Sequence, residues 1–239
     1  MASADSERKT YGILTEHEYD DWEGISEMIN LPDSWEHRSV DKAVVSAGET
    51  NPGKLFTAIV CPPCIYGPGR GPDNQRSVQA YNLSRGILTR GRGFKINEGE
   101  NIWHEIHIQD LSSLYLALVT ESLQPGGGKA TWNSQGYYFA ENGPIVWGEI
   151  SKKIAKIAAD KKFIPNAEVD SLPPGDANEL VRGAAFLLGT NARCKAIRGN
   201  KLLGWTPKEK CLTDLLPDIV EEEAKALGMI KGDAERVSG

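Results

Sequence analysis

The segment Cys61-Pro-Pro-Cys-Ile-Tyr-Gly-Pro-Gly-Arg-Gly71 decides the fold of this chain. It follows directly on the apolar run Thr57–Cys61, whose β-branched and apolar residues predict a buried strand. Two prolines end that strand abruptly, because proline cannot donate to a ladder and biases the residue before it away from helix. The three glycines after Tyr66 then allow the backbone to approach a ligand closely. The segment therefore predicts a strand that ends in a loop suited to binding.

This pattern resembles the nicotinamide-side loop of extended short-chain dehydrogenase/reductases, the NAD-dependent epimerase/dehydratase group, and most of all its fungal epimerase-like members. Three further segments resemble the same family in the same order. Gly99–Leu111 is similar to its glycine, short strand and His-hydrophobic-x-Asp helix start. Asn191-Ala-Arg193 and Leu203-Gly-Trp-Thr-Pro207 are similar to its Ser-Arg helix and its Leu-Gly-Trp-x-Pro turn. The chain is therefore identified as an atypical member of this family.

The nucleotide-binding start of the family is missing from the sequence. Members open with a strand, a Gly-x-x-Gly-x-x-Gly turn and a helix that together hold the cofactor pyrophosphate. Here Gly67, Gly69 and Gly71 are spaced by two residues, and Gly126–Gly128 follow a proline and indicate a helix stop. By resemblance, the chain begins near the fifth strand of that half. We expect a fragment, a truncated gene product, or a member that has lost ordinary cofactor binding.

The expected fold class is α/β, with a partial doubly wound, Rossmann-like parallel sheet and a small, mostly helical substrate-side lobe. Residues 1–135 are expected to form the distal part of the NAD(P)-binding domain and residues 136–239 the lobe, with strands that can cross this approximate boundary. A sheet without its first strands would expose an apolar edge, which predicts a homo-oligomer or a missing N-terminal segment. Apolar periodicity predicts helices over 35–48, 75–89, 110–123, 146–159, 178–188, 191–203 and 212–227.

Composition narrows the expected partners. Of the 239 residues, 40% are hydrophobic and 25% are charged, as in globular proteins. The net charge of -6 disfavours nucleic acid and anionic membranes as partners. No window of about 18 apolar residues predicts a membrane span, and the polar N-terminus is unlike a secretory signal. We expect a cytoplasmic protein that binds a small-molecule ligand.

The proton-transfer pair of the family is also absent. Family oxidoreductases carry Tyr-x-x-x-Lys on the helix before the glycine loop, where the lysine binds the nicotinamide ribose and lowers the tyrosine pKa. None of the 7 tyrosines here has a lysine four residues later. His37 and Asp41 have the required spacing and share a helix face, so they are the candidate catalytic pair. The alternatives are a surface or capping pair without a catalytic role, and Lys42 at the ribose site.

By resemblance, Pro62, Pro63, Cys64 and Ile65 form the cofactor-binding loop that backs the nicotinamide of NAD or NADP. Cys64 stands where an asparagine usually holds a nucleotide-sugar, and Trp103 stands where an arginine often holds its diphosphate. A thiol and an indole cannot replace an amide and a guanidinium in those tasks. We therefore expect a smaller or more apolar substrate.

The family's substrate pocket is expected where the Gly67–Arg76 loop, Trp103 and the Asn191–Arg193 segment converge. The candidate pocket residues are Arg76, Trp103, Asn191 and Arg193, and the alternative for Trp103 is a core aromatic. Cys61 and Cys64 are expected to be ordinary thiols, because a reactive pair normally lies at a helix N-terminus. No metal site is expected, since the histidines and cysteines lack ligand spacing.

Two classes of function follow. The first is an NAD(P)-dependent epimerase/dehydratase-like oxidoreductase, N-terminally incomplete, that acts on a small metabolite other than a nucleotide-sugar. The second is a degenerate or non-redox binding protein of the same family, without nicotinamide chemistry. The missing glycine turn and the missing Tyr-Lys pair predict that this chain binds NAD(P) weakly or not at all.

Overall fold

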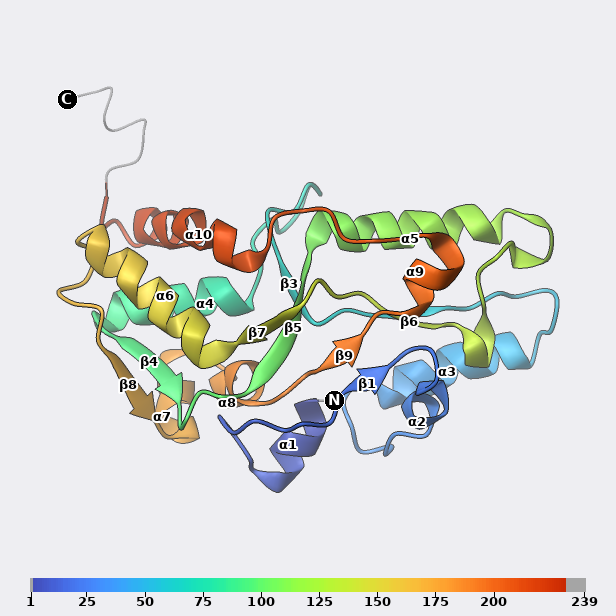
Figure 1. The fold of residues 1–239 in the computed structure, drawn as a ribbon, viewed down its shortest axis with the longest axis horizontal. Coiled ribbons are helices and arrows are strands. Elements are labelled where there is room, and N and C mark those ends of the chain that lie inside the picture. Colours follow the sequence, from blue (N-terminus) through green and yellow to red (C-terminus); the bar gives the residue numbers. More distant parts are fainter. Residues whose placement is uncertain (1, 231–239) are drawn as a thin grey trace.

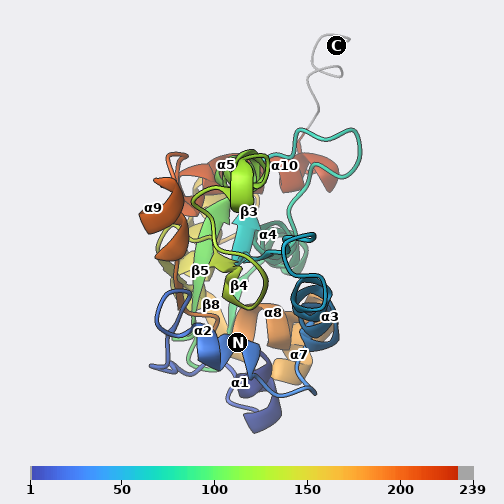
Figure 2. The same ribbon diagram turned by 90° about the vertical axis from the view of Figure 1, so that its right-hand side faces the viewer.

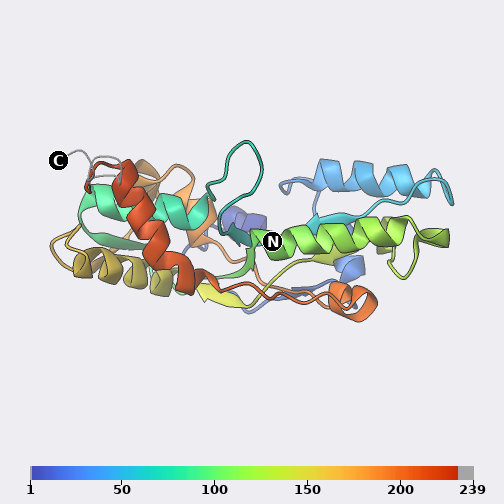
Figure 3. The same cartoon turned by 90° about the horizontal axis from the view of Figure 1, so that it is seen from above.

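The computed structural model describes residues 2–230 and shows an elongated molecule whose two ends are joined by a central sheet (Figure 1). The helical end comprises β4 (Gly93–Ile96), β8 (Val169–Leu172), α4 (Gln79–Arg90), α6 (Trp147–Asp160) and α10 (Leu212–Ala226). The Rossmann-like end comprises β2 (Ile59–Cys61), β6 (Tyr137–Phe139), α3 (Arg38–Glu49) and α5 (Ile108–Ser122). Figure 3 separates the two helix groups along the long axis. Within the described range, no helix is both long enough and apolar enough to cross a membrane.

The Rossmann-like end is built on two parallel strands. Val60 of β2 lies opposite Tyr138 of β6. Because side chains alternate between the faces of a strand, Val60 and Tyr138 pack with α5, while Ile59, Tyr137 and Phe139 pack on the other face with helix α2 (Ile25–Ile29). Residues of β6 are buried on both faces, as expected for a strand of a parallel sheet.

The central sheet continues the chain after the two prolines. Strand β3 (Cys64–Tyr66) pairs in parallel with β5 (Ile102–His107), and β7 (Pro144–Val146) pairs antiparallel with β5. Pro62 and Pro63 separate β2 from β3, so one apolar run is divided between two sheets. Figure 2 shows α5 above this sheet and the N-terminal helices α1 (Ala2–Arg8) and α2 below it.

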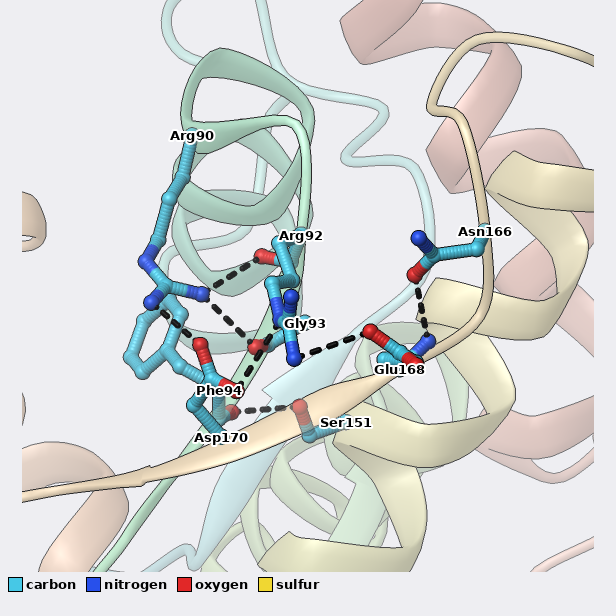
Figure 4. Close-up of polar contacts among 8 residues, drawn as sticks. All are labelled: Arg90, Arg92, Gly93, Phe94, Ser151, Asn166, Glu168 and Asp170. Atoms are coloured by element: carbon cyan, nitrogen blue, oxygen red, sulfur yellow. Dashed lines mark hydrogen bonds and ion pairs between the residues drawn. The ribbon is translucent and has the colours of Figure 1, made fainter.

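The helical end has the largest apolar cluster of the described residues. Ile87 of α4, Ile154 of α6 and Leu216 of α10 are fully buried there. Its two strands are also joined by ion pairs (Figure 4). Arg90 and Arg92 bind Asp170 at 2.5 and 2.9 Å, and Arg92 binds Glu168 at 2.9 Å. Helices α7 (Pro174–Leu180) and α8 (Ala184–Gly189) complete this end.

A buried acid ties the N-terminal segment to the Rossmann-like end. Asp21 follows β1 (Tyr19–Asp20), which pairs with β9 (Cys194–Lys195). Its carboxylate accepts hydrogen bonds from the backbone of Phe139, Ile197 and Arg198 at 2.8 to 2.9 Å. Arg198, the first residue of α9 (Arg198–Leu203), donates back to the Asp21 carbonyl at 2.7 Å. Strand β6 and helix α9 are thereby held on the same residue.

Two of the expected helices are wrong. The helix expected over 191–203 begins only at Arg198, because residues 191–195 are extended and pair with Trp103 and with β1. The helix expected over 178–188 is two short helices, α7 and α8, divided at Gly183, which has a φ of 74°. Strand β6, which belongs to the second half of the chain, pairs with β2 of the first half.

Candidate functional site

The cofactor-side loop is packed into the protein. The Cys64 side chain is fully buried, and burial together with the nearby Glu105 raises the pKa of its thiol. Burial also raises the pKa of Cys61, and both cysteines are free thiols. Pro63 is buried, and Pro62 and Ile65 are half-buried. The two thiols are therefore protonated at neutral pH, as ordinary cysteines are.

His37 and Asp41 are not partners in the structure. His37 is exposed at the start of α3, with a φ of 68°, and its side chain caps no helix N–H. Asp41 instead accepts a hydrogen bond at 3.1 Å from Arg38, which is 3% exposed. Arg38 also donates to the carbonyls of Ile29 and Leu31, so it locks the preceding loop onto α3. Sequence analysis missed this buried arginine.

Lys42 and Arg76 both have carboxylate partners. Lys42 pairs with Asp33 at the surface. Arg76 binds Glu223 at 2.6 Å, and Glu223 also binds Arg85 at 2.7 Å. Arg76 borders a cavity of about 320 Å³ that is lined by the glycine loop and the residues before α4.

The glycine loop itself is shaped by a histidine. Gly67 has a φ of 87°, and a Cβ there would come within 2.2 Å of His107 Nε2. The His107 Nδ1 atom accepts a hydrogen bond from the Gln109 N–H at 3.2 Å and so caps α5. The Asp110 carboxylate, in the first turn of the same helix, accepts from the backbone of Lys208 and Glu209.

Tyr66 and Glu105 lie on the neighbouring strands β3 and β5 of the central sheet, where Cys64 is the register partner of Glu105 and His107 that of Tyr66. Tyr66 is fully buried and donates to the Lys210 carbonyl at 2.8 Å, which is a structural contact. Glu105 is 3% exposed; one carboxylate oxygen accepts from the Leu212 N–H at 3.1 Å and the other has no partner. Burial raises the pKa of Glu105 to about 7. A buried acid thus titrates near neutrality where α10 begins.

Trp103 is a core aromatic. It is 8% exposed, belongs to the main apolar cluster, and donates its indole N–H to the Thr190 carbonyl at 2.7 Å. Its backbone bridges to Ala192, so it supports the extended segment that carries Asn191 and Arg193. These two residues line a different cavity from Arg76, and the two cavities share no lining residue.

We call the cavity that Asn191 and Arg193 line the N-terminal cavity. It has a volume of about 470 Å³ and lies between α1, β1, the loop before α3 and the Asn191–Arg193 segment. Asp5 holds its wall together. One oxygen of this 3% exposed carboxylate accepts from the backbone N–H and side-chain amide of Asn191, both at 2.7 Å. The other accepts from Thr10 and Thr15 at 3.2 and 3.1 Å.

The rest of the cavity wall carries donors and aromatic rings. Arg193 donates to the carbonyls of Thr15 and Glu16 at 3.1 and 3.0 Å. His17 Nε2 lies 2.9 Å from a Glu27 carboxylate oxygen, and its ring meets Tyr19 edge-on at 4.4 Å. Trp35 closes the wall. Sequence analysis missed the part of this site that precedes residue 35, because its candidate site residues begin at His37.

Comparisons with known proteins bear on the fold. No protein-family model matches the chain. Oxidase ucsJ from Acremonium sp. is 32% identical over 228 residues, which are 93% of this chain and 66% of the relative. The dTDP-glucose 4,6-dehydratase (rfbB) of Bacillus anthracis, in complex with NAD, superposes with a TM-score of 0.57 at 14% identity over 94% of this chain and 65% of that one. RMD from Pseudomonas aeruginosa, complexed with NADPH, gives 0.53 at 16% identity over 90% and 63%.

The chain has the fold of the NAD-dependent epimerase/dehydratase group. This confirms the expected resemblance and the α/β, Rossmann-like fold class. The chain spans slightly less than two thirds of the length of these proteins.

The described residues do not fit the phosphates of a dinucleotide. Such a group needs a strand that turns through glycines onto a helix N-terminus. In the described part of the chain, β5 runs directly into α5, and β8 reaches α7 through Pro173. The loop between β3 and α4 contains glycines, but the His107 ring fills the space beside Gly67. Of the two cavities described above, the N-terminal cavity is the larger.

Proposed function

We propose that this chain contributes the substrate side of an NAD(P)-dependent, epimerase/dehydratase-like oxidoreductase that acts on a small metabolite other than a nucleotide-sugar. The observation that carries the proposal is the N-terminal cavity in a chain with this fold. The oxidase name of the Acremonium relative supports an oxidoreductase class.

The size and chemistry of the cavity support a small substrate. Its volume of about 470 Å³ is within the usual range of roughly 300–1,000 Å³ for small-molecule sites. Cys64 and Trp103, the two departures from the nucleotide-sugar pattern, are both buried in the protein and line neither this cavity nor a phosphate site. At those two positions the chain therefore has no amide or guanidinium that could bind a nucleotide-sugar.

The alternative is a binding protein without nicotinamide chemistry. The exposed, unpaired position of His37 favours it, as does the missing pyrophosphate cradle among residues 2–230. On this alternative the cavity binds its ligand without turnover.

Calorimetry and a turnover assay distinguish the two functions. The purified 239-residue chain is titrated with NAD, NADH, NADP and NADPH, and each is then assayed for hydride transfer with a panel of small alcohols and ketones. Cofactor-dependent, saturable turnover supports the oxidoreductase. Ligand binding without any cofactor binding or turnover supports the alternative. Sub-micromolar NAD(P) binding to this chain would contradict the expectation that it binds the cofactor weakly.

A further inference from the structure

Most side-chain carboxylate oxygens of the N-terminal cavity are already in use. The two carboxylate oxygens of Asp5 accept four hydrogen bonds, from Asn191, Thr10 and Thr15. One oxygen of the Glu27 carboxylate lies 2.9 Å from His17 Nε2. A ligand that brings only donors would find few free carboxylate oxygens in this wall.

Two donors of the cavity wall, in contrast, are unused. Among the residues that the structure describes, the Tyr19 hydroxyl and the Arg8 guanidinium have no hydrogen-bond or ion-pair partner, and both residues line the cavity. Arg8 is exposed, whereas Tyr19 is 8% exposed. Trp35 Nε1 and Arg193 Nε also lack a partner, but these two atoms are buried and out of reach of a ligand in the cavity.

Burial keeps the Tyr19 phenol a donor. Burial raises the pKa of Tyr19, Glu27 and Asp5 raise it further, and Arg8 acts in the opposite direction. The hydroxyl is therefore protonated at neutral pH, and it belongs to the cavity that Arg8 also lines.

Part of the remaining wall is apolar. Leu31, Pro32 and Trp35 also line the cavity. An apolar body of a ligand can be buried against them while its polar group reaches the rim.

We propose that the N-terminal cavity binds a small organic acid with an apolar body, whose carboxylate lies between the Arg8 guanidinium and the Tyr19 hydroxyl. A carboxylate accepts several hydrogen bonds and can form a bidentate ion pair with a guanidinium, which a neutral carbonyl cannot do. The hypothesis uses the same cavity as the proposed function, but it requires no nicotinamide chemistry.

Three probes that share a benzyl group and differ in their polar group test the choice of ligand. The purified chain is titrated by calorimetry with phenylacetate, phenylacetone and phenethylamine. We expect phenylacetate to bind about tenfold more tightly than the ketone, and the amine not to bind measurably. Equal binding of the amine, or no binding of phenylacetate, would overturn the proposal.

Matched variants locate the site. Arg8→Gln is expected to weaken phenylacetate binding about tenfold and to leave the weak ketone binding unchanged, while Tyr19→Phe weakens both. Arg182→Gln removes an exposed arginine outside the cavity and should change neither. Thermal melts verify that each variant is folded. Full phenylacetate affinity in folded Arg8→Gln contradicts the proposal. Phenylacetate binding without turnover supports the organic-acid site and contradicts the proposed oxidoreductase. Turnover together with unaltered phenylacetate binding in Arg8→Gln supports the oxidoreductase and contradicts the organic-acid site.

Discussion

The helical end and the Rossmann-like end differ in how well their apolar side chains are covered. At the helical end, three helices enclose one apolar cluster, and arginines at its edge are paired with carboxylates. At the Rossmann-like end, β2 is only half-buried, and one face of α5 exposes large apolar side chains, with Leu116 at 67% and Val119 at 55%. The first end is complete within this chain. The second end leaves apolar surface uncovered, as a sheet with few strands must.

The largest expected effect compares two leucines, one at each end. Leu216→Ala removes a fully buried α10 side chain and should lower the free energy of unfolding by about 2–5 kcal/mol, through lost burial and a cavity. Leu116→Ala, on exposed α5, should change it by less than about 0.5 kcal/mol. Chemical denaturation measures both values. Equal losses would mean that α5 is covered in solution.

The next prediction concerns Glu105, on strand β5 of the central sheet between the two ends. Because the pKa of Glu105 is raised to about 7 in the folded protein, from 4.5 for an ordinary glutamate, the folded state favours the protonated acid. Stability from this group is fully present below pH 4.5 and is lost as the pH rises through about 7. The loss is at most about 3 kcal/mol.

Glu105→Gln tests this dependence. The glutamine oxygen can still accept from the Leu212 N–H, and it carries no charge to bury. We expect the variant to be more stable than the native chain at pH 8 and similar at pH 4.5. Denaturation curves across that range give the free energy of unfolding as a function of pH. If Glu105→Gln leaves the slope of this free energy against pH unchanged, another group controls the pH dependence.

The sequence predicts an element of this structure well where the pattern that indicates the element is local in the chain. The helices expected over 110–123, 146–159 and 212–227 match α5, α6 and α10 closely, because their apolar periodicity is local. The segment after Asn191 was mistaken for a helix because its partners are remote. Asn191 binds Asp5 across 186 residues. No spacing rule connects these residues, so the N-terminal cavity was outside what the pattern could predict.

Self-association is the next test of the comparison. We propose that the uncovered face of α5 promotes homo-oligomers, because Leu116 and Val119 lie one turn apart on it and are 67% and 55% exposed. Leu116→Lys/Val119→Lys should shift sedimentation toward the monomer at high protein concentration. Leu180→Lys, an exposed apolar position at the helical end, is the matched control. A native chain that is monomeric at every concentration would contradict the proposal.

The smallest expected effect concerns His37, at the start of α3. Its φ of 68° lies in the left-handed region, which costs energy for most side chains and less for asparagine. Asparagine is also a preferred N-cap, whereas the His37 side chain caps no N–H. His37→Asn should therefore raise the free energy of unfolding by about 0.5–1 kcal/mol. Because His37 is exposed and Asp41 is engaged by Arg38, ligand binding and any turnover should be unchanged. Thermal melts and the turnover assay measure the two effects on the same sample. Loss of turnover in a stabilised His37→Asn protein would restore the proton-transfer role that the spacing of His37 and Asp41 first indicated.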